Sequence, residues 1–379
     1  MANLSSEPHP SLAAERRGRR VSRVDPASVR RVLVIRPRFV GDLCLMLPVL
    51  DHLRRHAPHA EIDLLAEQPY ARLLEGDPRL RRVIAVPGKP STKRSAALYG
   101  ELARGGYDVT LDLFCNPRTA LWTLASGARV RVGYRNKGWR SAIYNRHPVH
   151  DEISAVRFHL ASIAALGWEV DGDAVPSLAL AARETWVERE RLRRRRIATP
   201  PEARWIGIHP GARWPTRQWD PARYAALAHR AAESDERNWA LVFGGPGEVE
   251  MAERVASEAD HPRVAAVTGL DLRELAALMS LCSACVGADS GPIHVSVATG
   301  TPTVGLFGRA LPERFFPYPP DRGHRAVYEG VWCSPCPLDV CSHTSCMRSI
   351  SVDRVWHALS EILTRTSPWP GSPPALVPA

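Results

Sequence analysis

Short apolar runs that alternate with helix-like segments, first in one half of the chain and then again in the other, constrain its fold more than any other feature. In the first half these runs lie at residues 31–35, 61–66, 82–86, 107–113 and 130–134. Such runs are typical of buried parallel strands, because helices cover both faces of those strands. Helices are expected between them at 43–56 and near 69–75. The alternation predicts a doubly wound α/β domain over residues 31–182.

An arginine-rich stretch at 183–203, which ends in Ala-Thr-Pro-Pro at 198–201, interrupts this pattern and predicts an exposed helix and an interdomain linker. The alternation then restarts over residues 204–350. Strands are expected at 205–209, 239–243, 264–268, 284–286 and 303–307, and helices at 221–234, 248–259 and 272–281. We therefore expect an α/β protein with two Rossmann-like, doubly wound domains that face each other across a cleft, followed by a helix at 351–366.

The two ends of the chain differ from this globular pattern. Residues 1–30 are rich in arginine without an apolar stretch, so they predict a disordered basic tail and no secretory signal peptide. Residues 367–379 are rich in proline and predict a second disordered tail. No apolar run reaches the roughly 20 residues that span a bilayer, which makes the cytoplasm the expected location.

The formal net charge of +10 favours acidic partners. Nucleic-acid recognition would require a basic face with aromatic residues or a known binding fold, and because neither is evident no nucleic-acid partner is expected. Weak attraction to anionic lipid fits the charge, and so does peripheral contact with the inner-membrane surface. Only three of the fifty basic residues are lysine (Lys89, Lys93 and Lys137), so arginine is expected where a relative would use lysine.

The first candidate loop, Arg-Pro-Arg-Phe-Val-Gly-Asp at 36–42, follows the first strand. Ligands of open α/β sheets bind outside the carboxyl ends of the strands, so this loop is expected to face the cleft. Gly41 allows a tight turn, and Asp42 stands at the start of a helix. Aspartate is a favoured N-cap, worth about 1 kcal/mol to its helix. From this spacing alone, capping is favoured over catalysis for Asp42.

Two glycine-containing turns in the second domain are candidates for binding phosphate. In His-Pro-Gly-Ala at 209–212, Gly211 lets the backbone approach a ligand, and Arg213 or Arg217 could form a bidentate contact with a phosphate. The turn Phe-Gly-Gly-Pro-Gly-Glu at 243–248 ends in Glu248. It is not a P-loop, because no Lys-Ser/Thr pair follows it.

A third turn, Gly-Ala-Asp-Ser-Gly-Pro-Ile-His at 287–294, is the most informative. It contains Asp289, Ser290 and Gly291, then a proline suited to the first turn of a helix, and His294 one turn further on. A helix start offers free N–H groups and a positive dipole end to a diphosphate. The three turns together indicate a nucleotide-diphosphate ligand. A dinucleotide is disfavoured, because no Gly-x-Gly-x-x-Gly follows the first strand.

Four of the eight cysteines cluster near the end of the second domain. They are Cys333, Cys336, Cys341 and Cys346. Their spacing is compatible with zinc, an iron–sulfur cluster or a redox pair, and equally with four reduced thiols in a packed loop. The other four cysteines are expected to be small buried residues.

In this order, the motifs resemble glycosyltransferase family nine, the ADP-heptose:lipopolysaccharide heptosyltransferases. The segments that carry the resemblance are 34–50, 209–212, 217–219, 244–248, 267–270 and 287–294, and it extends over about 31–363. It implies a GT-B fold, in which the last helix, here 352–365, crosses back to the first domain. It also implies that the cysteine segment is a family element and that neither a metal nor another cofactor is needed.

The resemblance assigns roles to residues. Asp42 would be the general base that deprotonates the acceptor hydroxyl, giving inversion at the anomeric carbon. Arg217, where relatives commonly have lysine, would stabilise the departing diphosphate with the helix start that ends at His294. Glu248 would bind the ribose and Asp289 the hydroxyls of the donor sugar.

Arg36 and Arg38 are expected on the acceptor side, in the first domain, which would bind a glycolipid or glycan acceptor. The second domain would bind the nucleotide sugar, with ADP-heptose as the leading donor. Three alternatives stay open: a GT-B enzyme with another donor or an epimerase, a non-catalytic nucleotide-sugar-binding protein, and a metal or redox protein built on the four cysteines.

Overall fold

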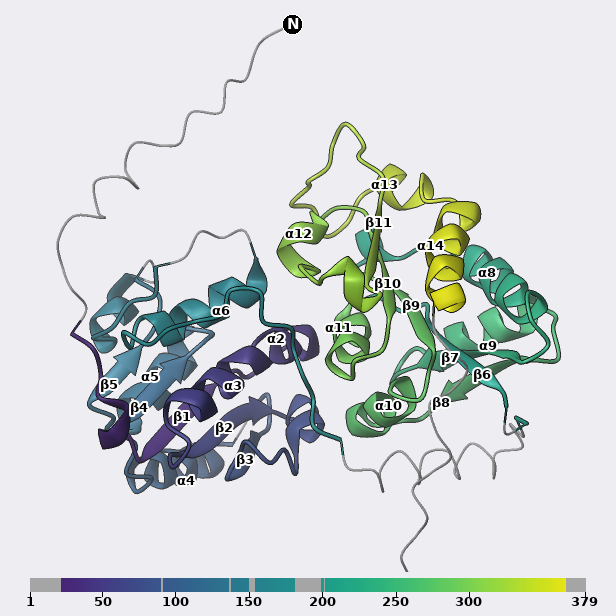
Figure 1. Ribbon diagram of the computed structural model, residues 1–379. Helices are drawn as coiled ribbons and strands as arrows, with labels where there is room; N and C mark the ends of the chain where they lie inside the picture. Colours follow the sequence, from purple (N-terminus) through teal and green to yellow (C-terminus); the bar gives the residue numbers. More distant parts are fainter. Residues whose placement is uncertain are drawn as a thin grey trace, which may run out of the picture.

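The computed structural model describes residues 22–89, 91–135, 138–149, 154–180, 199–200 and 202–365, which form two α/β domains side by side (Figure 1). Residues 1–21 of the expected N-terminal tail, most of the expected helix and linker at 183–203, and the whole of 367–379 lie outside the described residues. For residues 22–30 the expectation of a disordered tail is wrong, because the Val24 N–H donates to the carbonyl of Leu166, η1 (Pro26–Ser28) forms a 3-10 helix and Val29 is buried.

The first domain is built on a five-stranded sheet in the order β3-β2-β1-β4-β5, with every ladder parallel. Its strands are β1 (Arg31–Ile35), β2 (Glu61–Glu67), β3 (Arg82–Val86), β4 (Val109–Asp112) and β5 (Val130–Val132). The chain winds from β1 outward to β3 and then returns to β4 on the other side of β1. The strand order therefore reverses between β1 and β4, where a doubly wound sheet opens a crevice for ligands.

Helices cover both faces of this sheet. They are α2 (Val40–Leu45), α3 (Leu47–His56) and α6 (Ala155–Ala164) on one face, and α4 (Thr92–Ala103) and α5 (Pro117–Ala125) on the other. Alternate residues of β1 point to opposite faces of the sheet. Val32 and Val34 pack with α3 on one face, and Leu33 and Ile35 pack with α4 and α5 on the other. Every one of these four side chains is buried, which explains why β1 reads as one continuous apolar run.

The single helix expected at 43–56 is two helices. Met46 ends α2 and begins α3, and Pro48 lies in the first turn of α3, where its missing N–H is tolerated. The helix expected near 69–75 is a short 3-10 helix, η2 (Tyr70–Leu74).

The second domain has a six-stranded parallel sheet in the order β11-β10-β9-β6-β7-β8. Its strands are β6 (Arg204–His209), β7 (Asn238–Gly244), β8 (Val264–Thr268), β9 (Ala284–Ala288), β10 (Thr303–Phe307) and β11 (Arg325–Tyr328). Its longer helices are α8 (Pro221–Glu233), α9 (Val249–Glu258), α10 (Leu272–Met279), α11 (Gly291–Ala298) and α14 (Val352–Arg365). The strand order reverses between β6 and β9, so this sheet too has one switch point.

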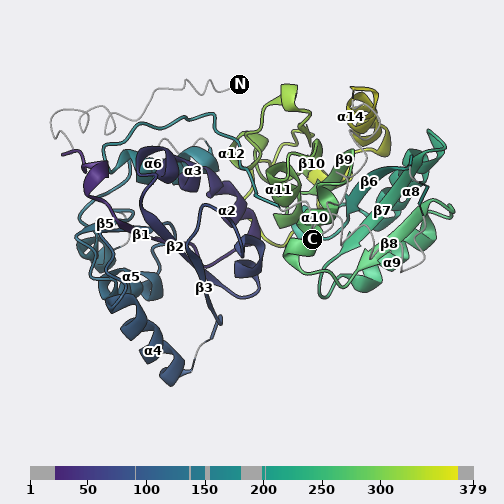
Figure 2. The same cartoon turned by 60° about the horizontal axis from the view of Figure 1, so that its bottom comes forward.

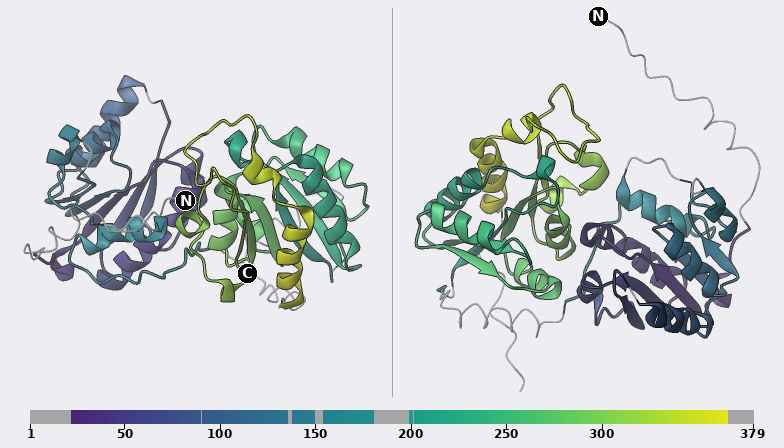
Figure 3. Two further views of the ribbon diagram at one scale, coloured as in Figure 1. Left: turned by 90° about the horizontal axis from the view of Figure 1, so that it is seen from above. Right: turned by 180° about the vertical axis from the view of Figure 1, so that it is seen from behind.

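The expectation that the last helix crosses back to the first domain is wrong. Helix α14 packs on α8 and on β9, β10 and β11 of its own domain (Figure 3). Its apolar stripe of Val355, Leu359, Ile362 and Leu363 is buried in the core of that domain. These side chains cover one face of the second sheet. They are therefore not free to pack against the first domain.

The two domains meet through helices rather than sheets. Helix α11 lies against α2, α10 against η2, and the short helix α12 (Pro312–Phe315) against α6 (Figures 1 and 2). Buried residues of these elements form one continuous apolar cluster that spans both domains. Arg72 of η2 also pairs with Asp271 at the N-cap of α10, with 3.1 Å between Nε and Oδ2. Within the described residues, no helix is both long enough and apolar enough to cross a membrane.

Candidate active site

The candidate residues gather at the two switch points, as the sheet topology requires. In the first domain Arg36, directly after β1, donates a hydrogen bond to the carbonyl of Leu113, directly after β4. In the second, Arg217 follows β6 and Asp289 follows β9, and Arg217 Nη1 lies 3.0 Å from Asp289 Oδ2. Each arginine therefore joins the two loops that border its crevice.

Asp42 has both carboxylate oxygens engaged. Its Oδ1 lies 2.5 Å from Arg36 Nη2, and its Oδ2 accepts a hydrogen bond of 3.1 Å from the backbone N–H of Phe39. Asp42 is the third residue of α2, so it caps the helix from inside its first turn and not from the N-cap position. Its side chain stays 33% exposed, so an incoming hydroxyl group can reach it.

Arginine and aromatic side chains surround Asp42 on the first-domain side. The guanidinium carbons of Arg36 and Arg38 lie 5.3 and 5.8 Å from the centre of the Phe114 ring. Arg118, in the first turn of α5, pairs with Glu67. The pKa of the Arg118 guanidinium is lowered by burial and by the positive charge of Arg38. The expected acceptor-side residues, Arg36 and Arg38, therefore lie near the same aromatic ring.

The first turns of α2 and α11 are in direct contact across the domain boundary. A β-carbon added to Gly291 would lie 1.9 Å from Val40 Cγ1, and one added to Gly41 would lie 2.9 Å from His294 Cδ2. Both positions require glycine because the helices approach so closely. The contact brings the candidate base of one domain beside the candidate diphosphate site of the other.

The start of α11 has unused hydrogen-bonding capacity. Ser290 is its N-cap residue, but the side chain makes no capping hydrogen bond, and its Oγ is buried without a partner in the described structure. The first backbone N–H groups of a helix have no partners within the helix, and the positive end of the helix dipole lies there. A phosphate group would satisfy these donors together with the Ser290 hydroxyl.

His294 is a buried residue at the domain boundary, where its ring lies against Gly41 of the first domain and is hydrogen-bonded to Tyr318 of its own domain. Its Nδ1 lies 2.9 Å from the Tyr318 hydroxyl, and burial, aided by the charge of Arg217, lowers its pKa to about 3. The imidazole is therefore neutral at pH 7, and the positive potential at this helix start comes from the backbone and Arg217. Tyr318 was not expected from the sequence, where it lies in a proline-rich stretch without a motif.

Arg217 and Asp289 form the polar floor of the second crevice. Besides the ion pair, Arg217 Nη1 donates to the Asp289 carbonyl at 3.2 Å. Burial raises the pKa of the Asp289 carboxyl, and the charges of Arg217 and Arg309 oppose that rise. A carboxyl group that is this desolvated gains from additional donors, such as the hydroxyls of a bound sugar.

Glu248 lies directly against Gly211. A β-carbon at Gly211 would be 2.0 Å from Glu248 Oε1, so only glycine fits. The other oxygen, Oε2, is 3.2 Å from His209 Nε2 and accepts from the Gly245 N–H at 3.0 Å. Although burial raises the pKa of Glu248, these contacts outweigh that effect and lower it overall. Oε1 is left facing the backbone of Gly211, so Glu248 and Gly211 share one binding surface.

Several buried polar atoms around the two crevices have no hydrogen-bond partner within the described residues. They are Nε of Arg36, Arg38 and Arg217, Nδ1 of His209 and Oγ of Ser290. Buried polar groups in proteins nearly always have partners, and exceptions mark places where a ligand or water binds. With Oδ2 of Asp289, six of the thirteen such atoms of the described residues lie here, where a polar ligand between the domains could bond to them.

Arg213, which the sequence offered as a second phosphate ligand, instead reaches the other domain. Its guanidinium carbon lies 4.2 Å from the centre of the Phe39 ring. This cation–π contact joins the loop after β6 to the residue just before α2. Of the two arginines, only Arg217 is paired with Asp289 at the switch point of the second sheet.

Three of the four clustered cysteines lie in the loop between β11 and the short helix α13 (Ser345–Arg348), and the fourth, Cys346, belongs to α13 itself. All four are free thiols; Cys346 is buried and the other three are partly exposed. Within the described residues, which include all four, no group of three or more histidine, cysteine or acidic side chains is arranged to hold a metal ion. Cys346 packs beside Gly308, so the loop covers the end of β10.

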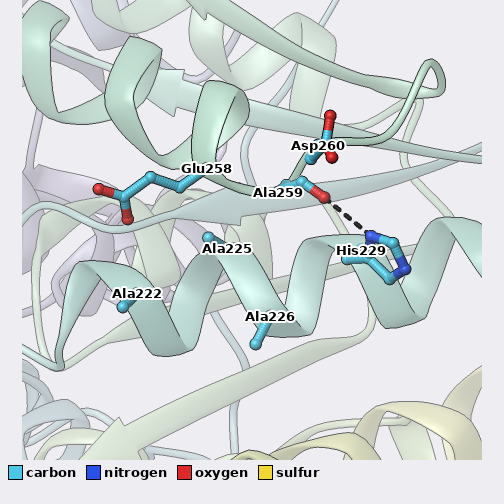
Figure 4. Close-up of a pocket in the computed structure, with 7 residues that line it drawn as sticks. All are labelled: Ala222, Ala225, Ala226, His229, Glu258, Ala259 and Asp260. Atoms are coloured by element: carbon cyan, nitrogen blue, oxygen red, sulfur yellow. Dashed lines mark hydrogen bonds between the residues drawn. The ribbon is translucent and has the colours of Figure 1, made fainter.

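A separate depression of about 400 Å³ lies between α8 and α9 (Figure 4). Alanines form much of its wall, and His229 is hydrogen-bonded to the carbonyl of Ala259 at 2.8 Å. None of its lining residues belongs to the candidate site.

Comparison with known proteins agrees with this geometry. The family model described as glycosyltransferase family 9 (heptosyltransferase) matches residues 95–346. The chain is 26% identical over 285 residues to lipopolysaccharide heptosyltransferase 3 of Escherichia coli, which covers 72% of this chain and 81% of that protein.

Solved structures show the same fold. A glycosyl transferase family 9 protein from Veillonella parvula superimposes with a TM-score of 0.76 at 22% identity, covering 90% of this chain and 99% of that one. E. coli ADP-heptose lps heptosyltransferase II gives a TM-score of 0.72, also at 22% identity, over 88% and 99% of the two chains. With two parallel-sheet domains and a family match over more than half of its length, the protein has a GT-B fold and belongs to glycosyltransferase family 9.

Proposed function

We propose that this glycosyltransferase transfers a heptose from ADP-heptose to a lipopolysaccharide-core or similar glycan acceptor, with inversion at the anomeric carbon and without a metal ion. In this proposal the first domain binds the acceptor and the second binds the nucleotide sugar. The observation that carries it is the contact between the first turns of α2 and α11, which brings Asp42 beside the helix start at Ser290.

Asp42 is the proposed general base. It is partly exposed, and Arg36 and the Phe39 N–H fix the orientation of its carboxylate. The carboxylate removes the proton from an acceptor hydroxyl as that oxygen attacks the anomeric carbon. The new C–O bond forms on the side opposite the diphosphate, the bond to the diphosphate breaks, and the configuration inverts. A base in this position contributes typically 10²- to 10⁴-fold to the rate.

The departing ADP takes the electron pair of the broken bond, and its charge must be stabilised. The first turn of α11, the Ser290 hydroxyl and Arg217 are the proposed donors for the diphosphate oxygens. Because His294 is neutral and hydrogen-bonded to Tyr318, it contributes shape and a hydrogen bond rather than charge. Glu248 beside Gly211 is the proposed ribose site, and Asp289 the site for donor sugar hydroxyls.

The identity of the donor is supported by the relatives. A structural neighbour is named ADP-heptose lps heptosyltransferase II, and a relative in sequence is named lipopolysaccharide heptosyltransferase 3. A lipid-linked acceptor and the net charge of +10 support a place at the cytoplasmic face of the inner membrane.

The donor is tested by calorimetric titration of the purified protein with ADP-heptose and with GDP-, UDP- and dTDP-sugars. Selective binding of ADP-heptose, followed by release of ADP when a lipopolysaccharide-core acceptor is added, is the expected result. Preference for another nucleotide sugar would overturn the donor but keep the mechanism. Donor binding without turnover on any acceptor would favour a non-catalytic binding protein.

Metal independence needs its own experiment because of the four clustered cysteines. We expect transfer to continue at an unchanged rate in excess chelator, since Arg217 and the start of α11 supply the positive potential for the leaving group. Loss of transfer on chelation, with recovery on adding back one metal, would overturn this part of the proposal.

A further inference from the structure

One stretch of the first domain combines a long one-sided charge with exposed apolar side chains. Between Asp112 and Asp151 the sequence has seven basic residues and not one acidic residue. The basic residues are Arg118, Arg129, Arg131, Arg135, Lys137, Arg140 and Arg146. A protein surface normally mixes charges of both signs, so a run of one sign is unusual, although Arg118 is paired with Glu67 from another segment.

The same stretch exposes large apolar side chains. Leu121 and Leu124 of α5 are 43% and 55% exposed, and Trp139 of the 3-10 helix η3 (Gly138–Ile143) is 65% exposed. On α5, Pro117, Leu121 and Leu124 recur at the spacing of one helical face, and all three are exposed. The opposite side of the helix holds the buried Trp122, so α5 is apolar both inside and outside.

Helix η3 packs against α5 and brings Trp139 to this part of the domain. Arg140 Nη1 donates to the carbonyl of Cys115, which ties η3 to the loop before α5. Arg129 and Arg135 are exposed, and among the described residues neither forms an ion pair. What we call the α5–η3 face consists of Leu121, Leu124 and Trp139, together with Arg129 between α5 and β5 and Arg135 between β5 and η3.

We propose that the α5–η3 face docks on an anionic phospholipid bilayer, with Leu121, Leu124 and Trp139 entering the interface and the arginines contacting lipid phosphates. Leucine and tryptophan beside arginine is the composition of interfacial membrane-binding surfaces. A purely electrostatic partner, such as a nucleic acid or an acidic protein, would leave the exposed leucines and Trp139 unexplained.

The position of the face fits the proposed reaction, on which this inference rests for its purpose. Helix α5 begins at the carboxyl edge of the sheet, where Arg118 is close enough to Arg38 for their charges to interact. It then runs outward along the flank away from the second domain (Figures 1 and 2). Nine residues of helix span about 13 Å. A lipid-anchored acceptor could thus keep its acyl chains in the bilayer while its sugars reach Asp42.

Vesicle flotation of the full chain tests the docking surface. The probes are vesicles of phosphatidylcholine alone and of phosphatidylcholine with phosphatidylglycerol at 7:3. We expect the wild type to bind the anionic vesicles at least tenfold more tightly than the neutral ones. The triple variant Leu121→Gln, Leu124→Gln, Trp139→Gln should lose about tenfold in binding to the anionic vesicles.

A matched control exists in the second domain, where another loop exposes a tryptophan and two aliphatic residues. The control variant is Trp332→Gln, Leu338→Gln, Val340→Gln, and it should bind vesicles like the wild type. A second control removes charge from the N-terminal tail through the substitutions Arg16→Gln, Arg17→Gln, Arg19→Gln and Arg20→Gln. The proposal would be overturned if the tail variant or the second-domain variant lost vesicle binding while the triple variant kept it. Equal binding of the wild type to neutral and anionic vesicles would also overturn it.

Two further measurements separate this proposal from the proposed function. The triple variant should keep wild-type affinity for ADP-heptose and wild-type transfer to a delipidated, water-soluble acceptor, while losing transfer to acceptor embedded in anionic vesicles. Wild-type protein that binds vesicles but not ADP-heptose would overturn the function and leave the docking surface standing. Unchanged transfer to embedded acceptor by the triple variant would overturn the docking surface alone.

Discussion

Gly291 at the start of α11 has no room for a side chain, because a β-carbon there would lie 1.9 Å from Cγ1 of Val40 at the start of α2. The two residues belong to different domains and are 251 positions apart in sequence. Their contact therefore sets how closely the proposed base and the proposed diphosphate site approach.

Gly291→Ala should separate the two helix starts and lower turnover by about tenfold or more, since small displacements of reacting groups are costly. Adding Val40→Ala removes the obstructing methyl and should restore most of the rate, measured as ADP release. Gly100→Ala in α4 is the control, because its β-carbon would meet only the mobile end of Arg104. A single variant as active as the wild type would show that this close approach is not needed.

Asp42→Asn should reduce kcat by about 10² or more and leave the affinity for the donor unchanged, because the amide cannot accept the proton. Steady-state rates with saturating donor, together with calorimetry of donor binding, measure the two quantities separately. Asp51 lies in α3 and pairs with Arg79 away from the candidate site. The control variant Asp51→Asn should therefore change neither kcat nor donor affinity. Wild-type kcat in the Asp42 variant would remove this residue from the proposed role.

Arg217→Ala should weaken donor binding and also slow transfer, since its charge faces the proposed diphosphate site in both the ground state and the transition state. Arg217→Lys keeps the charge but loses the planar guanidinium, so partial recovery is expected. The control is Arg254→Ala, which breaks an exposed pair with Glu258 on α9. If ADP-heptose binds the alanine variant and the wild type equally well, Arg217 does not contact the donor.

The free energy of unfolding should fall as the pH drops below about 6.5. Burial lowers the pKa of His294 to about 3 and that of His324 to about 4, from the usual 6.5. At a pH between the folded and unfolded pKa values, these histidines are protonated in the unfolded chain but not in the folded one. Lowering the pH therefore favours the unfolded state. Each of these histidines should cost about 2 kcal/mol of stability by pH 5.

Denaturant titrations at pH 7.5, 6 and 5 measure this loss. His324→Phe removes one titrating group from an aromatic pocket formed with Phe316 and Tyr318, and it should flatten the profile. His357→Gln, at an exposed position in α14, should leave it unchanged. A profile of the same slope in all three proteins would show that His324 takes up its proton equally in both states.

Most strands were predictable because both faces of each sheet are covered, so that β1, β7 and β10 are largely apolar. The edge strand β11 was not predicted from the sequence. Helices α4, α5 and α6 were not predicted from the sequence. The structure shows why for α5: its outer face is apolar like its inner face, so the helical period is weak. For α14 the period was visible, but an amphipathic stripe does not specify which of two domains it covers.

For the site, the sequence located the loops but not their contacts. The rule that ligands bind at the carboxyl ends of strands placed Arg36, Asp42, Arg217 and Asp289 at the cleft. The roles of these residues came from family resemblance, since the spacing of Asp42 alone favoured a cap. The partnership of His294 with Tyr318 and the contact of Arg213 with Phe39 depend on how segments distant in sequence pack, and no local pattern encodes that.

Because α14 stays on its own domain, the described chain passes between the domains once, near Ser177 and Leu178: Arg79 of the first domain donates to the carbonyl of Ser177, and the Leu178 N–H donates to the carbonyl of Ala298 in the second domain. In a GT-B protein whose last helix packs on the first domain, replacing one domain by that of a relative would require two junctions in the chain. Here a single cut within the described chain would separate the proposed acceptor domain from the proposed donor domain, so a chimera that joins this first domain to the second domain of another family member requires only one splice. New pairings of donor and acceptor could arise in the same way during evolution, by one recombination event within one gene.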